Sequence, residues 1–185
     1  YTGVLYAALD YATVPDRRRA NRRLAVVSSV FGLIGMTDRI PAYRLSGGSR
    51  LLGGLPGLWR DLVTAEVERE RGLVVDMLSS PYTSFVRVPD AVTVKVWQTG
   101  PAGQRTAASH FNKATKGRIV RALLEDGANP RTPARLADAL LDLGWTVEVD
   151  ATGGRAELDV AEVGDAGHQF LTERPCGPRA RRAAR

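Results

Sequence analysis

Two lysines near the start of an expected helix are the residues best suited to bind an anion. Lys113 and Lys116 fall on the apolar face of a helix expected from about 112 to 125, one turn before its aliphatic residues. We therefore expect both ammonium groups to point inward, toward a cleft. Two positive charges at a helix amino terminus oppose the helix dipole at a cost of about 0.3–1 kcal/mol each, and a bound phosphate or carboxylate would remove that cost.

Gly117 directly follows the second lysine and removes a side chain from the same helix. Glycine inside a helix costs about 1 kcal/mol relative to alanine, so its presence suits the close approach of a ligand or of another backbone. The alternative is that both lysines reach from the helix end to water while Gly117 packs on a neighbouring element. The two interpretations fit these residues equally well.

A second candidate segment, residues 28–35, follows an expected strand and ends in Gly32-Leu33-Ile34-Gly35. Glycines at this spacing occur in the hairpin between two helices through which several DNA-binding modules bind phosphate by backbone N–H groups. This gives Gly32 and Gly35 a predicted role as backbone donors. An ordinary turn has the same glycine spacing more often.

A third candidate, residues 78–82, lies at the end of another expected strand, where open sheets place ligand contacts. Ser79 and Tyr82 can donate hydrogen bonds to an anion, and the serine could equally cap the following turn. Nucleophilic catalysis by Ser79 lacks a base, and neither His110 nor His168 has the neighbours of a metal ligand. We therefore predict no catalytic residue, no metal and no cofactor.

The composition fits one globular domain with a basic surface. The 185 residues are 44% hydrophobic and 25% charged, which is enough to build a core. A net charge of +6 permits a polyanionic partner, although the arginine-rich stretch 17–23 fits a solvated face better. The single cysteine, Cys176, excludes an intrachain disulfide and suits a reducing cytoplasm. No apolar run approaches the roughly 18 residues of a membrane-spanning helix.

Local patterns predict alternating helices and strands. Alternating valines in 92–98 and a Gly-Pro turn indicate a hairpin with 105–110, and the apolar run 73–78 indicates a strand buried on both faces. The other expected elements are helices at 4–11, 16–23 capped by Asp16, 56–71, and 132–143 capped by Thr132, a buried strand at 24–28, a loop at 29–41, and a hairpin of 145–151 with 156–163.

These elements predict an α/β fold of the mixed α+β kind. We expect a mixed β-sheet with hairpins, flanked by helices, in one domain over residues 1–163, followed by a disordered basic tail at 164–185. In the helix at 56–71, we expect Leu58, Leu62 and Val63 to face inward.

Six short segments, taken in order, resemble the YaaA peroxide-stress family over about residues 1 to 160. They are Tyr1-Thr2-Gly3, the turn at 28–32, Ile40-Pro41-Ala42-Tyr43-Arg44-Leu45, Trp59, Met77-Leu78-Ser79-Ser80-Pro81-Tyr82, and Lys113-Ala114-Thr115-Lys116-Gly117 with Arg121. Two residues depart from the family pattern, because Ser84 stands where better-known members carry lysine and Lys116 replaces arginine. The family's amino-terminal Pro-x-Lys strand is absent, so we expect this chain to begin partway into the family domain.

The resemblance implies a cytosolic protein of the hydroperoxide response that limits iron-linked damage, with DNA binding as its molecular activity. The implied nucleic-acid partner would be bound largely without sequence specificity, and the candidate DNA- or anion-binding residues are Arg44, Ser79, Tyr82, Lys113, Lys116, Gly117 and Arg121. The rival hypothesis is an enzyme on a small phosphorylated or carboxylated metabolite, with Lys113 or Lys116 as electrostatic stabiliser or base.

Overall fold

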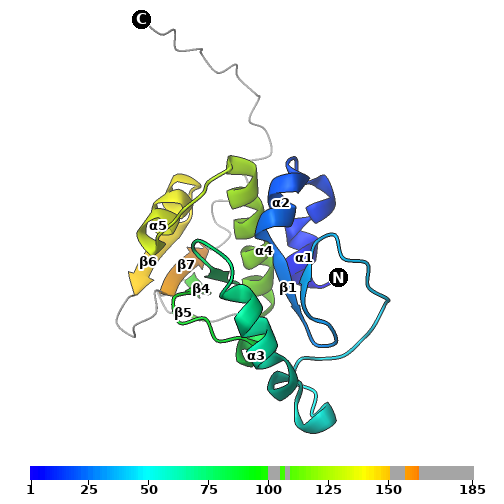
Figure 1. Ribbon diagram of the computed structural model, residues 1–185. Coiled ribbons are helices and arrows are strands. Elements are labelled where there is room, and N and C mark those ends of the chain that lie inside the picture. Colours follow the sequence, from blue (N-terminus) through cyan, green and yellow to red (C-terminus); the bar gives the residue numbers. More distant parts are fainter. Residues whose placement is uncertain (100–104, 107–108, 151–156, 163–185) are drawn as a thin grey trace, which may run out of the picture.

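The central sheet is mixed, as the sequence predicts (Figure 1). The computed structural model describes residues 1–99, 105–106, 109–150 and 157–162. Its main sheet has the order β3 (Val75–Asp76), β4 (Val92–Thr99), β7 (Glu157–Glu162) and β6 (Thr146–Asp150), with β5 (Arg105–Thr106) paired to the end of β4. Strands β3 and β7 run parallel to β4, whereas β5 is antiparallel to β4 and β6 is antiparallel to β7. The predicted fold class is therefore confirmed.

The main core lies between this sheet and two helices, α4 (Ser109–Asp126) and α5 (Pro133–Asp142). Val92, Val94 and Val96 of β4 are buried on the core face because side chains alternate along a strand. The opposite face is polar, and there Lys95 pairs with Glu157 of β7 at 2.5 Å. The period-two valine pattern thus determines which face of β4 meets the helices.

Helix α5 follows its sequence signals closely. The hydroxyl of Thr132 accepts a hydrogen bond from the Arg135 amide, and Gly144 ends the segment at φ +88°. Helix α4 begins at Ser109, three residues before the expected start. The expected strand 105–110 is confirmed at 105–106 and wrong at 109–110, which already belong to the helix, whereas 107–108 lie outside the described residues.

The amino-terminal helices form a second core against α4. Helix α1 (Val4–Leu9), the short η1 (Tyr11–Thr13) and α2 (Arg17–Arg23) lie beside α4 in Figure 1, opposite α5. The second core consists of Leu9, Val14, Ala20 and Leu124. The Asp16 carboxylate accepts from the Arg19 amide and caps α2, as predicted.

The predicted loop at 29–41 is wrong in its first part. Strand β1 (Ala25–Ser28) turns back and pairs antiparallel with β2 (Gly32–Gly35), forming a separate two-stranded sheet. The indole of Trp59 lies over this turn and donates to the Ser29 carbonyl at 3.0 Å. A Cβ on Gly32, at φ +73°, would lie 2.6 Å from Cε3 of Trp59. Glycine is therefore required there by the packed indole and by the backbone.

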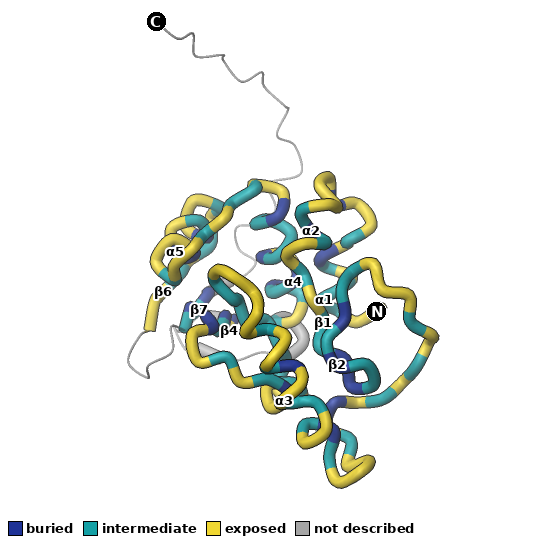
Figure 2. The backbone as a smooth tube through the Cα atoms, viewed as in Figure 1, coloured by how far each residue is buried: buried dark blue, intermediate teal, exposed yellow. Residues whose placement is uncertain are grey.

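Trp59 belongs to α3 (Leu55–Val67), which packs on one side only. The 3-10 helix η2 (Leu51–Gly53) precedes α3. Another 3-10 helix, η3 (Ser80–Phe85), packs against α3. Val63 is buried as predicted, but Leu58 and Leu62 are 50% and 64% exposed, so their predicted inward orientation is wrong. The exposed side of α3 is visible in Figure 2. Amphipathic spacing marks an apolar face but does not establish that another element covers it.

The expected strand 73–78, buried on both faces, is shorter and less buried than predicted. Only Val75 and Asp76 pair with β4, and both are half-buried, because β3 ends the main path of the sheet. None of the described helices is long and apolar enough to cross a membrane. The predicted tail at 164–185, including Cys176 and His168, lies outside the described residues.

Candidate anion-binding site around Lys116

Lys116 reaches inward from α4 and is half-buried, as predicted. Its Nζ donates to the Leu78 carbonyl at 3.0 Å. Burial lowers the pKa of Lys116, and the nearby Asp76 carboxylate raises it by a smaller amount. In the described part of the chain, no carboxylate lies within 4.0 Å of this ammonium group. An ammonium has three donors, so two remain for an anion.

Lys113 lies one turn earlier on the same helix and is exposed, so its predicted inward orientation is wrong. Because α4 begins at Ser109, neither lysine lies in the first turn, where free amides and the helix dipole would favour an anion. The neighbouring Asn112 has a buried Oδ1 with no hydrogen-bond partner within the described ranges. Lys116 itself, rather than a helix end, therefore supplies the positive charge of this site.

A group of tyrosines joins three distant segments on the amino-terminal side of the site. The hydroxyl of Tyr43 lies 2.7 Å from Ser28 Oγ and 2.6 Å from the hydroxyl of Tyr1. The ring of Tyr1 stacks on Tyr6 with centroids 5.0 Å apart, and Phe31 meets Tyr43 edge-on at 5.6 Å. These contacts bring together the start of α1, the end of β1 and the loop after β2.

The phenols of this group differ in acidity. Burial raises the pKa of Tyr6 to about 12, and the nearby Tyr82 and Tyr43 add to the shift. Burial by itself would raise the pKa of Tyr43, but hydrogen bonds with Ser28, Tyr1 and Ser29 stabilise its phenolate and lower the pKa. Tyr6 therefore keeps its proton at neutral pH and would meet an anion as a hydrogen-bond donor.

Ser79 and Tyr82 are both half-buried on the segment that binds Lys116. The Ser79 carbonyl accepts a hydrogen bond from the Tyr82 amide at 2.8 Å. The Ser79 hydroxyl makes no capping hydrogen bond to η3. The ring of Tyr82 packs against Gly47, where a Cβ would lie 2.9 Å from its Cε1. The capping alternative for Ser79 is therefore not what the structure shows.

Gly117 and Arg121 hold α1 against α4. A Cβ on Gly117 would overlap the Leu5 carbonyl oxygen and lie 3.0 Å from the Leu9 amide nitrogen. The Arg121 guanidinium donates to the carbonyls of Leu9 and Asp10, both at 3.1 Å, and so satisfies the carboxyl end of α1. The predicted close approach of another backbone to Gly117 is thus confirmed, and that backbone belongs to the neighbouring helix α1.

For the remaining predicted residues, the described part of the chain shows no hydrogen bond to Lys116. The Gly35 amide donates to Asp38 Oδ2 at 2.9 Å, and both Gly32 and Gly35 belong to β2. The predicted hairpin between two helices is therefore wrong. Arg44 is exposed and directly follows Tyr43. His110 lies in α4, but its side chain is outside the described residues.

Replacing Arg121 by alanine should destabilise the protein without changing anion binding at Lys116. The change removes three hydrogen bonds, including one of 2.8 Å to Thr13 Oγ1, and two ion pairs, 2.8 Å to Glu125 and 3.5 Å to Asp10. We expect a loss of about 1.5–3 kcal/mol in the free energy of unfolding, measured by urea denaturation. Arg121→Lys, which keeps the charge but not the planar fork, should recover only part of it. A loss of anion binding at unchanged stability would instead place Arg121 in the site.

Sequence reasoning did not select Tyr6 or Asp76 as site residues. Both occur inside ordinary amphipathic or apolar stretches, and only the tertiary structure brings Asp76 near Lys116 and Tyr6 near Tyr82 and Tyr43. By contrast, hydrogen bonds join the segments at 1–3, 28–32 and 40–45, and another joins the segments at 77–82 and 113–117, all of which were chosen from sequence.

The fold and the site thus define a mixed α/β protein with a half-buried lysine on α4 and a hydrogen-bonded tyrosine group at the amino-terminal side. Residues 1–150 match the family model described as peroxide stress protein YaaA, and the chain belongs to this family. It is 48% identical over 175 residues to a UPF0246 protein of Streptomyces coelicolor, covering 86% of this chain and 66% of that relative. A UPF0246 protein of Corynebacterium glutamicum is 41% identical over 154 residues, with 80% and 62% covered. The chain thus spans slightly less than two thirds of these relatives.

Proposed function

We propose that this chain acts in the cytoplasmic hydroperoxide response and limits iron-linked damage by binding DNA at the site around Lys116. The peroxide-stress role is supported by the name of the family to which the chain belongs. The cytoplasmic location is supported by the single cysteine. DNA binding is supported by the net charge of +6 and by the chemistry of the site.

The observation that carries the proposal is the half-buried ammonium of Lys116, which forms no ion pair with a carboxylate within the described ranges. Its described hydrogen bond goes to a neutral carbonyl, which leaves the positive charge free to attract a phosphate. Lys113, one turn earlier on α4, and Arg44, which directly follows Tyr43, are both exposed and can contact other phosphates of the same nucleic acid. Ser79 and Tyr82 add neutral donors. Such contacts would bind the backbone and be largely indifferent to base sequence.

Lys116→Ala should weaken the salt dependence of DNA binding. The slope of log K against log salt should become about one unit less steep, because one phosphate contact is lost. Lys95→Ala is the matched control, since Lys95 already pairs with Glu157 on the sheet face away from α4. The measurement is a salt titration with labelled single-stranded and duplex DNA, with thermal unfolding of both variants as a check on folding. Equal slopes for both variants and wild type would contradict DNA contact at Lys116.

An enzyme acting on a small phosphorylated or carboxylated metabolite is the second candidate. The burial of Lys116 favours it, because a half-buried cation reaches a small anion more easily than a duplex. Burial lowers the pKa of Lys116, which is also the direction required of a lysine base. Salt-independent binding of inorganic phosphate or acetate that disappears in Lys116→Ala, without DNA binding by wild type, would support this candidate.

A further inference from the structure

Arginines from two distant segments gather at the carboxyl end of α4. Arg23 of α2 donates from Nη1 to the Ala128 carbonyl at 2.5 Å, and the Arg19 guanidinium lies against Gly127. Arg131 follows on the same loop. We call Arg19, Arg22, Arg23 and Arg131 the arginine cluster. The close contacts of Arg19 and Arg23 with the loop show that the cluster is a product of the fold and not only of the run of arginines in the sequence.

The positive charges of the cluster are poorly compensated. Burial lowers the pKa of Arg23, and the charges of Arg19, Arg22 and Arg131 lower it further. Asp16 is the acid that opposes this effect, and it pairs with Arg19 at 3.7 Å. Among the residues that the structure describes, no carboxylate lies within 4.0 Å of the other three guanidinium groups. The folded chain thus accepts like-charge repulsion that a bound polyanion would relieve.

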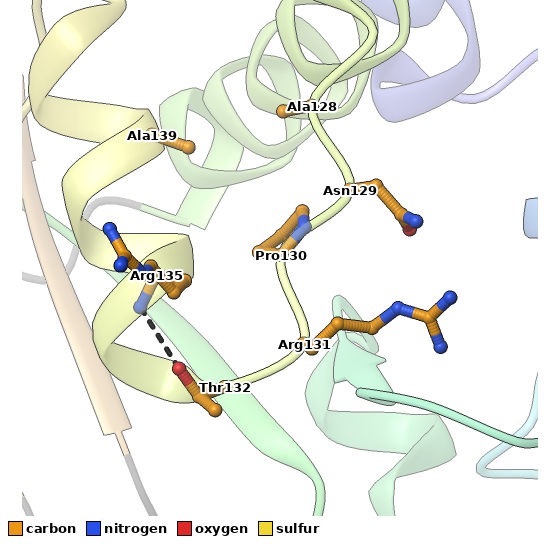
Figure 3. A pocket seen from close by; sticks show the side chains of 7 residues that line it. All are labelled: Ala128, Asn129, Pro130, Arg131, Thr132, Arg135 and Ala139. Carbon is orange, nitrogen blue, oxygen red and sulfur yellow. Dashed lines mark hydrogen bonds between the residues drawn. The ribbon is translucent and has the colours of Figure 1, made fainter.

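A shallow depression adjoins the cluster on the loop between α4 and α5 (Figure 3). It encloses about 540 Å³ and is lined in part by Ala128, Pro130 and Ala139. In Figure 3, the side chains of Asn129 and Arg131 extend on one side of the loop, and Arg135 lies on the other. Because the carbonyl of Ala128 also binds Arg23, the depression and the cluster are continuous.

The cluster is too distant from Lys116 to share one small anion with it. Ten residues of α4 separate Lys116 from Asp126, the last residue before the loop, which corresponds to about 15 Å along the helix axis. A nucleic acid carries phosphates at regular intervals and can bridge this distance. The planar forks of arginine also match phosphate oxygens better than point charges do.

We propose that the arginine cluster is a second contact surface for nucleic acid, which binds the phosphate backbone independently of base sequence. This inference rests on the proposed DNA binding and adds a surface beyond the Lys116 site. The sequence alone favours a solvated face for residues 17–23, whereas their convergence with Arg131 favours a polyanion. Arg22 and Arg131 are the exposed members of the cluster for which no hydrogen bond or ion pair is described, so they are free to contact phosphate.

The test is a salt titration of duplex DNA binding by the Arg22→Gln/Arg131→Gln variant. We expect the slope of log K against log salt to fall by about two, because two phosphate contacts are removed. Arg39→Gln/Arg50→Gln is the charge-matched control, with two exposed arginines on the loop between β2 and α3 replaced. The cluster variant should unfold at the same temperature as wild type or at a higher one, because it relieves repulsion. Polyglutamate, titrated in parallel, should bind more weakly than DNA.

The other outcomes separate the two proposals. A normal slope in the cluster variant together with a reduced slope in Lys116→Ala would overturn the arginine surface and leave DNA binding at Lys116 intact. If the salt slope fell equally in the cluster variant and in the charge-matched control, the effect would be due to net charge alone. That result would also overturn the arginine surface. Polyglutamate binding as tight as DNA binding would replace nucleic acid by an acidic protein as partner. No DNA binding by wild type would overturn both proposals.

Discussion

Phe85→Ala should reduce the free energy of unfolding by about 3–5 kcal/mol, the largest loss that we expect from a single substitution. Phe85 is fully buried at the end of η3, and its ring lies 5.3 Å from that of Tyr82. Removing the ring leaves a cavity between η3 and α3, which pack on each other. Because η3 follows the carbonyl that binds Lys116, the change should also loosen Tyr82 in the candidate site.

Urea denaturation measures this loss, with Leu58→Ala as the control. Leu58 has half of its surface exposed on α3, so its truncation should change stability by about 0.5 kcal/mol or less. Phe85→Leu, which keeps most of the buried apolar volume, should recover much of the stability. A Leu58→Ala cost as large as that of Phe85→Ala would show that the exposed side of α3 is covered in solution and would contradict the burial described here.

Gly117→Ala should destabilise the protein by about 1–3 kcal/mol, although alanine normally favours a helix. The added Cβ would overlap the Leu5 carbonyl oxygen and lie 2.9 Å from Ala8 Cβ. These are backbone and first-carbon atoms, which cannot rotate away as the end of a long side chain can. Helix α1 would have to move off α4, and the contacts of Tyr1 and Tyr6 with the site would shift with it.

Gly57→Ala is the matched control for this prediction. Gly57 is also inside a helix, but a Cβ there would meet no atom within 4 Å. Alanine should therefore stabilise α3 by up to about 1 kcal/mol, because the helix propensity gain meets no clash. Thermal and urea unfolding of the two variants give the comparison. A Gly117→Ala protein as stable as the Gly57→Ala protein would refute the close approach of α1 to α4.

The elements that the sequence predicts best are those with local causes. Thr132 caps α5 and Asp16 caps α2 because a side-chain oxygen reaches an amide three residues ahead, whatever the rest of the chain does. The valines of β4 are buried because their period of two matches a strand with one core face. Family membership could also be predicted, since it rests on short segments that can be compared directly.

The candidate site was predicted only in part, because its residues depend on which helices meet. The inward orientation of Lys116 agrees with its place on the apolar face of α4, but the same pattern predicted an inward Lys113, which is exposed. Gly117 and Arg121 lie on α4 as expected, yet α1 occupies the space that a ligand would need. A helical wheel gives the direction of a side chain but not the element that it faces.

By itself, the sequence determined the mixed α/β class, the family, the capped helices and the core face of β4, since each follows from neighbouring residues or from a short periodic pattern. Tertiary structure alone decided that β2 pairs with β1, that Leu58 and Leu62 remain exposed, and that Arg23 and Arg131 share one surface. These features depend on contacts between segments far apart in the chain, and local propensity carries no information about such contacts.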